Sequence, residues 1–274
     1  MYCIRKRLLV WALAALLCPA QQCGADTARE IASKAMPSLL LLVMADTTGQ
    51  PISLGSGFIV DDGIVVTNLH VLSGSASGTS KVVGSKQTFA IGGVVAVDAE
   101  HDLALLQIEG IPKASLPLAD SSKCAVGDVV YAVGNPQGFE GTMSQGIISG
   151  LRTLGKASLL QITAPISPGS SGGPVLNESG AVVGVAVATY TDGQNLNFAV
   201  PAKRISDLLQ KRGNVQRLAA LRASAPAESV PSFVTPSVAD AIEAGNFEWI
   251  YKVLDDGDFS FTLIPVQDRF SLKG

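Results

Sequence analysis

Short apolar or alternating segments occupy the chain from Leu39 to Val200, and polar turns such as Asp61-Asp62-Gly63 separate them. Ten of these segments are predicted strands: Leu39–Met44, Gly57–Val60, Ile64–Thr67, Phe89–Val97, Leu103–Ile108, Val129–Val133, Gly146–Ser149, Leu159–Ile162, Val182–Ala188 and Asn197–Val200. A parallel sheet would need crossover helices of about a dozen residues or more, and the pattern contains none. The sequence therefore predicts antiparallel barrels or a sandwich.

The pattern changes after Pro201. Ala202 to Arg212 is the first predicted helix, and it ends at Gly213. Residues 214–236, rich in Ser, Pro and Ala, are expected to form a linker, and 237–274 a C-terminal tail of unknown role. In this tail a capping-box pattern precedes Ala241–Ala244, and Phe247–Leu254 is expected to form a second short helix. A solvated or weakly ordered tail is favoured over such a helical hairpin.

The N-terminus has the pattern of an export signal. Three basic residues, Arg5, Lys6 and Arg7, precede the apolar run Leu8–Cys18, which is too short to span a bilayer. We therefore expect residues 1–25 to be a signal peptide and 26–36 a lead-in to the folded domain. Cleavage is expected after residue 20 or residue 25. Acylation of Cys23 and a retained N-terminal anchor are the alternatives.

Composition and charge narrow the function classes. The chain is 47% hydrophobic and 16% charged, with 28 glycines, which argues against disorder. The net charge of −3 includes the three N-terminal basic residues, so the remainder carries −6 and is not expected to bind nucleic acid. Because the chain has only two histidines and no Cys/His cluster, we expect neither a metal site nor a cofactor. Cys124 and Cys23 could form at most one disulfide in the exported chain.

Three segments carry residues suited to nucleophilic catalysis. A predicted strand runs into His70, Asp102 opens another strand, and Ser171 stands in the glycine-rich turn 167–174. A serine hydroxyl needs a base to accept its proton, histidine suits that role, and a buried carboxylate can orient the imidazole. Backbone N–H groups of Gly169 and Ser171 would then form an oxyanion hole. The order His, Asp, Ser is that of chymotrypsin-like enzymes.

Each segment also has a structural interpretation: a hydrogen-bonded histidine, a turn aspartate and an ordinary Gly/Ser loop. His101 is a poor partner for Asp102, because neighbouring residues on a strand point to opposite faces. Ser170 is the alternative nucleophile. Asp98 and Asp120 are spare carboxylates without the Leu-Ala-Leu-Leu strand that follows Asp102. The combination of all three segments in this order favours the triad.

These residues resemble the HtrA (high-temperature-requirement) branch of trypsin-like serine proteases. The resemblance covers about residues 37 to 211, and its matching stretches are Gly55–Val60, Thr67–Val71, Asp102–Leu106, Val126–Asp128, Val133–Pro136, Gly146–Ser149, Pro168–Pro174 and Asn197–Pro201. It implies an all-β protease domain over residues 37–213, built from two six-stranded antiparallel barrels, at about 37–118 and 119–201, with the active site between them. It assigns the roles of base, orienting acid and nucleophile to His70, Asp102 and Ser171.

The chain also departs from the family. Ser170 stands where the family usually has Asn, and Thr163–Ile166 lacks a common Asp, so substrate preference does not transfer. Since neither Val185–Tyr190 nor Thr163–Ile166 holds an acidic residue, a small or aliphatic substrate side chain is expected. Nothing after residue 213 resembles a PDZ domain. The loop Gly134–Gly138 matches one that, in the family, helps to order the oxyanion turn.

The sequence thus predicts an exported serine endopeptidase, periplasmic or secreted, that cleaves unfolded or damaged proteins through an acyl-enzyme on Ser171. Polypeptide substrates are the expected partners, and a homo-oligomer stays open. Stable membrane insertion after signal removal is not expected. A protease-fold binding protein or holdase is the main alternative, and an esterase using the same residues is another.

Overall fold

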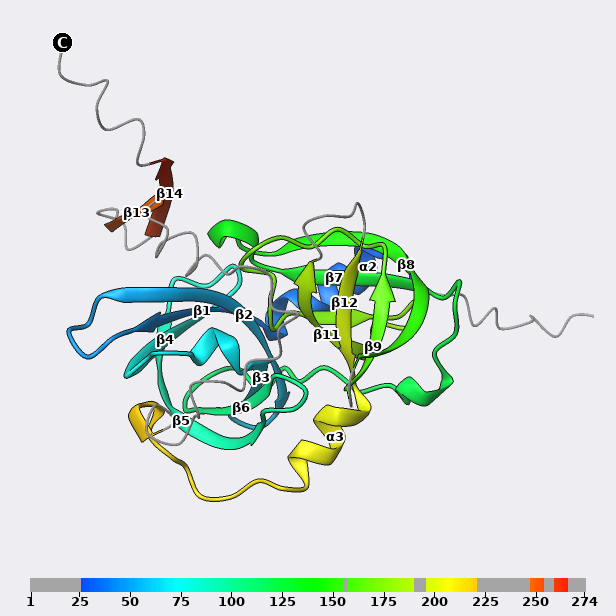
Figure 1. The fold of residues 1–274 in the computed structure, drawn as a ribbon, viewed down its shortest axis with the longest axis horizontal. Coiled ribbons are helices and arrows are strands. Elements are labelled where there is room, and N and C mark those ends of the chain that lie inside the picture. Colours follow the sequence, from blue (N-terminus) through cyan, green and yellow to red (C-terminus); the bar gives the residue numbers. More distant parts are fainter. Residues whose placement is uncertain (1–25, 155–156, 190–195, 221–246, 254–258, 266–274) are drawn as a thin grey trace, which may run out of the picture.

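A computed structural model describes residues 26–154, 157–189, 196–220, 247–253 and 259–265. Two closed, six-stranded antiparallel barrels lie side by side (Figure 1). This arrangement confirms the predicted fold class. The signal-peptide prediction for residues 1–25 and the expected helix at Ala241–Ala244 lie outside the described residues.

The first barrel contains six strands in the order β1-β2-β3-β6-β5-β4. Their bounds are β1 Leu39–Ala45, β2 Pro51–Asp61, β3 Ile64–Asn68, β4 Ser77–Val82, β5 Thr88–Asp98 and β6 Leu103–Ile108. Successive side chains of a strand point to opposite faces. Accordingly Leu40 and Leu42 belong to the cluster inside this barrel, whereas Leu39 packs into a second cluster shared with the other barrel. A strand buried on both faces explains the unbroken leucine run in β1.

The second barrel has the order β10-β11-β12-β9-β8-β7. Its strands are β7 Val129–Gly134, β8 Thr142–Leu154, β9 Ala157–Ile162, β10 Pro174–Leu176, β11 Val182–Thr189 and β12 Asn197–Pro201. Val130, Ile148 and Val175 pack inside this barrel. Tyr131 and Val185 instead join the shared cluster, which places an apolar layer between the two barrels.

Helices are few and short. The α-helices are α2 Ala28–Ala35 and α3 Lys203–Leu209, and single 3-10 turns are η2 Met36–Ser38, η3 His70–Leu72, η4 Ser121–Lys123 and η5 Pro136–Gly138. The predicted helix after Pro201 is thus present, with narrower bounds. Helix α2 was not predicted: a capping box between Thr27 and Glu30 starts it, and Ile31 is fully buried in the shared cluster. The segment 26–36 is therefore part of the fold rather than a simple lead-in.

All ten predicted strands are present, and two further strands of the barrels were missed. Strand β4 was missed because its sequence is polar and small-residue rich, and β10 because it has only three residues after the glycine-rich turn. Both close their barrels: β4 pairs with β1 and β5, and β10 pairs with β7 and β11.

The chain after α3 returns to the first barrel. Val94 and Gln216 form a β-bridge, and Leu218 is buried in the core of that barrel. A Cβ on Gly93 would lie 2.3 Å from the Gln216 carbonyl oxygen, so this approach requires glycine. The first residues of the expected linker 214–236 are therefore docked on the barrel.

The prediction of a short helix at Phe247–Leu254 is wrong. Residues Phe247–Val253 form strand β13, which pairs antiparallel with β14, Phe259–Pro265. Aromatic and β-branched residues dominate both segments, and Asp255-Asp256-Gly257 between them is a turn sequence. These features favour a hairpin over a helix.

In the part of the chain that the structure describes, no helix is long and apolar enough to cross a membrane.

Candidate active site

His70 and Asp102 are paired at the end of the first barrel's strand β3. The Asp102 carboxylate accepts a hydrogen bond from the His70 backbone N–H at 2.8 Å, and its other oxygen lies 2.5 Å from His70 Nδ1. Asp102 is 4% exposed, whereas the His70 side chain is 25% exposed. The pair therefore has a buried carboxylate and an imidazole that reaches solvent.

The local backbone fixes this pair. Asp102 has a left-handed φ of 53°, which is uncommon for a residue other than glycine. Its carbonyl oxygen accepts hydrogen bonds from Asn68 Nδ2 and Leu69 N, at 2.9 and 3.1 Å. Because these donors immediately precede His70, the same contacts set the position of the carboxylate and the start of the histidine turn.

Ser171 lies in a turn of the second barrel that packs against the first. Its carbonyl oxygen accepts a hydrogen bond from Ser56 N of β2 at 2.8 Å. Its hydroxyl donates to the Val187 carbonyl oxygen at 3.4 Å, a long contact, and among the described residues it has no hydrogen bond to His70. Catalytic hydrogen bonds are often long or misaligned before substrate binds. The structure thus pairs His70 with Asp102 and gives the Ser171 hydroxyl one long hydrogen bond.

The turn orients two backbone N–H groups. The Pro168 carbonyl oxygen accepts a hydrogen bond from Gln137 N at 2.8 Å. Since C=O and N–H point in opposite directions across a trans peptide, the Gly169 N–H points away from Gln137. Within the described residues, neither this N–H nor that of Ser171 has a hydrogen-bond acceptor. These are the two donors that the sequence assigned to an oxyanion hole.

Gly172 is required by both conformation and space. Its φ is +85°, and a Cβ there would lie 2.1 Å from the Ser56 carbonyl oxygen. Gly172→Ala should therefore lower the free energy of unfolding by more than the ~1–2 kcal/mol that a left-handed conformation costs an alanine. It should also lower activity, because Ser171 must shift. Chemical denaturation and peptide cleavage measure the two effects.

Gly49→Ala is the matched control for that substitution. Gly49 has a φ of +83°, but a Cβ added there would have no atom within 4 Å. It should show only the conformational cost and keep full activity. Equal destabilisation by the two variants would contradict the close packing of the turn against the first barrel.

The alternative residues have other partners. His101 Nδ1 lies 2.9 Å from Asp98 Oδ2, and this histidine is 5% exposed. Asp120 accepts hydrogen bonds from Ser122 at the start of η4. Ser170 is 7% exposed, and its hydroxyl accepts a 3.4 Å hydrogen bond from Ser167 N. None of these contacts joins the His70–Asp102 pair.

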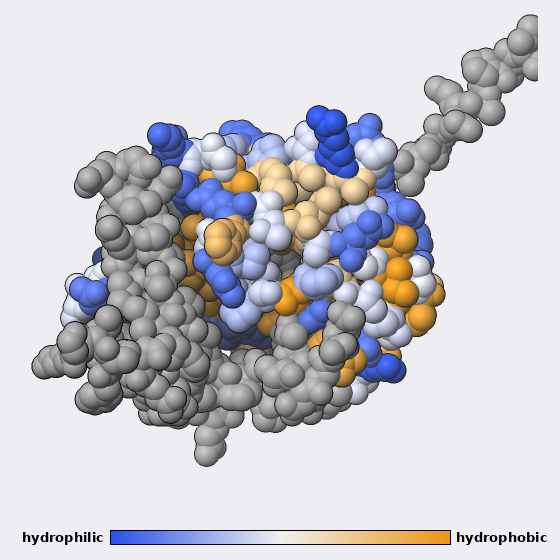
Figure 2. Space-filling view, turned by 90° about the horizontal axis from the view of Figure 1, so that it is seen from above, coloured by the Kyte–Doolittle hydropathy of each residue, from blue (hydrophilic) through white to orange (hydrophobic). Residues whose placement is uncertain are grey.

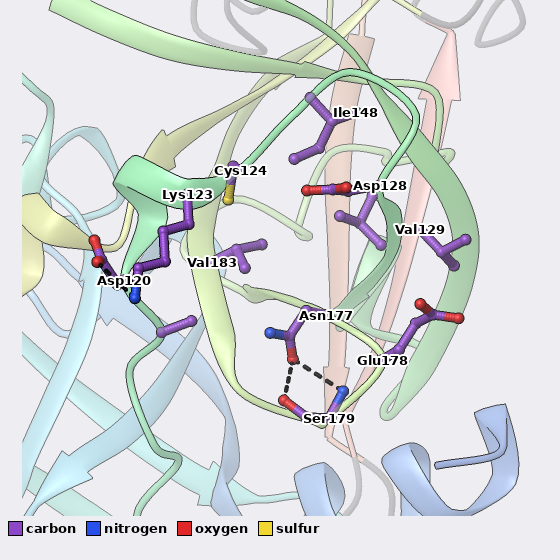
Figure 3. Close-up of a pocket in the computed structure, with 12 residues that line it drawn as sticks. Asp120, Lys123, Cys124, Asp128, Val129, Ile148, Asn177, Glu178, Ser179 and Val183 are labelled. Atoms are coloured by element: carbon purple, nitrogen blue, oxygen red, sulfur yellow. Dashed lines mark hydrogen bonds and ion pairs between the residues drawn. The ribbon is translucent and has the colours of Figure 1, made fainter. Parts of the chain in front are cut away.

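Two of the molecule's cavities concern the second barrel. One, of about 140 Å³, adjoins the glycine-rich turn 167–174, and Ser170, Pro165 and Ile166 line it together with residues of the loop 134–144. The other, of about 290 Å³, contains Cys124 and the acidic residue Asp128 (Figure 3). None of the candidate catalytic residues lines this second cavity.

Cys124 is unsuited to be a nucleophile. Burial raises the pKa of its thiol, and the nearby carboxylates of Asp128 and Asp120 raise it further. The thiol therefore stays protonated at neutral pH, whereas the thiolate is the reactive form. Within the described residues it is a free cysteine, and no group of three His, Cys, Asp or Glu residues could hold a metal ion.

Sequence reasoning missed the side-chain roles of Ser56 and Asn135. Asn135 is fully buried and donates to the Leu40 carbonyl oxygen at 2.9 Å, while its Oδ1 accepts from Gly141 N at 3.1 Å. Both residues stand in stretches that carry the family resemblance, but only the structure shows that Ser56 Oγ donates to the Gly169 carbonyl oxygen of the turn and accepts a hydrogen bond from Asn135 N.

Comparisons with known proteins find similarity to trypsin-like peptidases. The family described as "Trypsin-like peptidase domain" matches residues 55–185. The protein HhoA of Synechocystis sp. is 41% identical over 175 residues, covering 59% of this chain and 44% of HhoA. A chain of Pseudomonas putida named "Probable periplasmic serine endoprotease DegP-like" is 32% identical over 253 residues, covering 88% of this chain and 51% of that one. This chain thus spans about half or less of the length of these relatives.

Solved structures show the same fold. The HtrA-type protease AlgW, solved with a tripeptide, has a TM-score of 0.62 and 29% identity, over 68% of this chain and 63% of that one. The Rv3671c protease from M. tuberculosis, in its active form, has a TM-score of 0.63 and covers 71% of this chain and 90% of its own. At 24% identity the second match supports the fold alone.

Proposed function

We propose that this chain is a serine endopeptidase with Ser171 as nucleophile, His70 as base and Asp102 as the orienting acid. Its similarity to trypsin-like peptidase domains and to HtrA- and DegP-type proteases supports the reaction class. The observation that carries the proposal is the His70–Asp102 contact, which involves both the backbone N–H and Nδ1 of the histidine. This contact fixes the ring so that Nε2 faces away from the carboxylate.

The chemistry follows from that orientation. Asp102 accepts a hydrogen bond from the N–H at His70 Nδ1. This holds the tautomer in which Nε2 carries no proton and can accept the proton of Ser171 Oγ. For this step the hydroxyl rotates away from the Val187 carbonyl oxygen, whose 3.4 Å contact is weak. The serine oxygen attacks the peptide carbonyl, and the leaving amine takes the proton back from His70. Water then hydrolyses the acyl-enzyme by the same route.

Two further interactions support rate enhancement. The N–H groups of Gly169 and Ser171 would bind the negatively charged oxygen of the tetrahedral intermediate, and fixed donors of this kind act without reorganisation. The buried carboxylate of Asp102 stabilises the imidazolium that forms during attack. Both groups are held by backbone contacts that are in place before substrate arrives.

Unfolded or damaged proteins outside the cytoplasm are the proposed substrates. The N-terminal segment has the pattern of an export signal, which supports a location outside the cytoplasm. Relatives named as periplasmic endoproteases support the periplasm or the exterior as the location. On the face seen in Figure 2, hydrophilic and hydrophobic residues are intermixed.

The test is a map of cleavage sites in a reduced, unfolded protein. The wild-type chain should create new peptide N-termini in the unfolded substrate and far fewer in its native form, and Ser171→Ala should create none. An absence of new N-termini with the wild-type chain, or equal numbers with Ser171→Ala, would contradict the proposal.

A protease-fold binding protein is the second candidate. The contact of the Ser171 hydroxyl with Val187 rather than His70 favours it. Such a protein would delay aggregation of an unfolded substrate without cutting it, and it would do so equally with alanine at position 171. Light scattering and peptide mapping on the same samples separate the two functions.

A further inference from the structure

Ser56 of β2 makes contacts that nothing in the reaction scheme above uses. It is fully buried, and its hydroxyl donates to the Gly169 carbonyl oxygen at 2.7 Å. Its backbone N–H donates to the Ser171 carbonyl oxygen at 2.8 Å. A single residue of the first barrel thus binds the carbonyl groups of both residues whose N–H groups point into the oxyanion hole.

We propose that the Ser56 hydroxyl is the positioning group of the oxyanion hole, a role that rests on the proposed endopeptidase function. Gly169 is the residue in need of positioning, because glycine populates both halves of the φ range and its φ here is +94°. The peptide before Gly169 is held by the Gln137 N–H on the Pro168 carbonyl oxygen, and the peptide after it is held by Ser56. With both peptide planes fixed, the Gly169 N–H has one direction.

The same hydroxyl also positions the loop that contains Gln137, whose N–H holds the peptide before Gly169. Ser56 Oγ accepts hydrogen bonds from Asn135 N at 2.9 Å and from Asn135 Nδ2 at 3.2 Å. Asn135 in turn binds Gly141 N at the far end of the loop that contains Gln137. Removing the hydroxyl therefore loosens Gly169 from both sides and leaves the buried Asn135 N–H without its acceptor.

An ion pair also joins this loop to the first barrel. Lys81 Nζ of β4 lies 2.8 Å from Glu140 Oε1, and the lysine side chain is 10% exposed. This ion pair joins Glu140 of the loop to the barrel, whereas the Ser56 hydroxyl binds the Gly169 carbonyl oxygen directly. The effect of losing the Ser56 hydroxyl should therefore be local to the oxyanion turn, with the loop still attached to the barrel.

The experiment compares Ser56→Ala with Ser80→Ala. Ser80 is a matched control: it is a serine of the same barrel, 1% exposed, with one hydrogen bond to the Phe89 carbonyl oxygen at 3.3 Å. Loss of one oxyanion donor typically lowers kcat by about 10²–10³, so misplacement of the Gly169 donor by Ser56→Ala should lower kcat roughly 10- to 100-fold with little change in KM. Ser80→Ala should keep the wild-type kcat.

The affinity of a transition-state analogue distinguishes misplacement of the Gly169 N–H from a general loss of stability. A peptidyl boronic acid forms a tetrahedral anionic adduct with a nucleophilic serine, so its affinity should fall by the same factor as kcat/KM. The pH dependence of kcat/KM should keep its wild-type shape, because Ser56 does not contact the His70–Asp102 pair. If Ser56→Ala fails to fold, Ser56→Cys is measured in the same way, since the thiol keeps the volume but is a weaker donor and acceptor.

The outcomes separate this inference from the proposed function. A wild-type chain without activity, or an active Ser171→Ala chain, would overturn the proposed function itself. With an active wild type, an unchanged kcat in the Ser56 variant, a change in KM alone, or an equal loss in Ser80→Ala would overturn the positioning role. A loss of kcat matched by weaker boronic acid binding supports it.

Discussion

Replacing Ser171 with alanine is expected to lower kcat for peptide cleavage by about 10⁵–10⁶, the size of effect seen when a serine nucleophile is removed. The neighbouring Ser170 cannot easily take its place, because it is buried against the second barrel. The Cys124 thiol lies outside the turn, and burial raises its pKa. The fold should remain intact, since the Ser171 hydroxyl makes one long hydrogen bond. Cleavage of a fluorogenic peptide and thermal unfolding measure both effects.

Ser170→Ala is the matched control for this substitution. A Cβ on Gly134 would lie 3.3 Å from the Ser170 hydroxyl, which shows that this side chain faces β7 rather than solvent. Activity within about tenfold of the wild type is therefore expected, since the substitution removes one weak hydrogen bond and no reacting atom. A larger loss in Ser170→Ala than in Ser171→Ala would show that the nucleophile is Ser170.

Replacing Asp102 with asparagine should lower kcat by about 10⁴. The amide oxygen can still accept the His70 backbone N–H, so the ring stays in place. The amide NH₂, however, donates to Nδ1 and forces the proton of the neutral imidazole onto Nε2. With Nε2 protonated, His70 cannot accept the serine proton. KM should change little, because Asp102 is buried and does not reach the substrate.

Asp98→Asn is an unusually close control. Asp98 contacts His101 as Asp102 contacts His70, through the backbone N–H at 3.2 Å and Nδ1 at 2.9 Å. The pair lies where β5 ends and the turn to β6 begins, and in the described residues no hydrogen bond joins it to the turn that contains Ser171. Its substitution should lower stability, because His101 is buried, and should leave kcat within about tenfold of wild type. Similar losses of kcat in the two variants would mean that the His70–Asp102 pair has no special role.

The sequence predicted most barrel strands well because apolar patterning and turn residues are local signals. The choice of two barrels over a sandwich came from the family resemblance. Leu103–Ile108 is a strand with the predicted bounds, since burial on both faces selects a continuous apolar run. This local signal was too weak to predict β4, whose sequence is polar, and β10, which has only three residues. It also failed at α2, whose eight residues carry a capping box but only a narrow apolar face. At Phe247–Val253 an expected helix proved to be a strand.

The candidate site shows a similar division. The order and surroundings of His70, Asp102 and Ser171 were sufficient to single them out, because each lies in a distinctive local sequence. The supporting contacts were not predictable. Ser56 and Gly169 are 113 residues apart, and their hydrogen bond exists because two barrels pack together. The hydrogen bond from Gln137 N to the Pro168 carbonyl oxygen likewise depends on how two distant segments of the second barrel pack together.

The pairing of His101 with Asp98 illustrates the limits of reasoning from neighbours. The alternation of side chains along a strand excluded His101 as the partner of Asp102, and in the structure the two are not paired. The same alternation gave no sign that one of the spare carboxylates would hold this histidine in a contact of the same form. Residue types alone therefore do not distinguish the two pairs; the nearby serine turn does.

Mass spectrometry after treatment with a fluorophosphonate probe tests the central claim most directly. The probe phosphonylates a serine only where a base and an oxyanion site activate it. The adduct is expected on the peptide that contains Ser171, and it should be absent from Ser171→Ala and strongly reduced in Asp102→Asn. A folded wild-type chain that remains unlabelled, or that carries the adduct on a different serine, would contradict the assignment of Ser171 as the nucleophile.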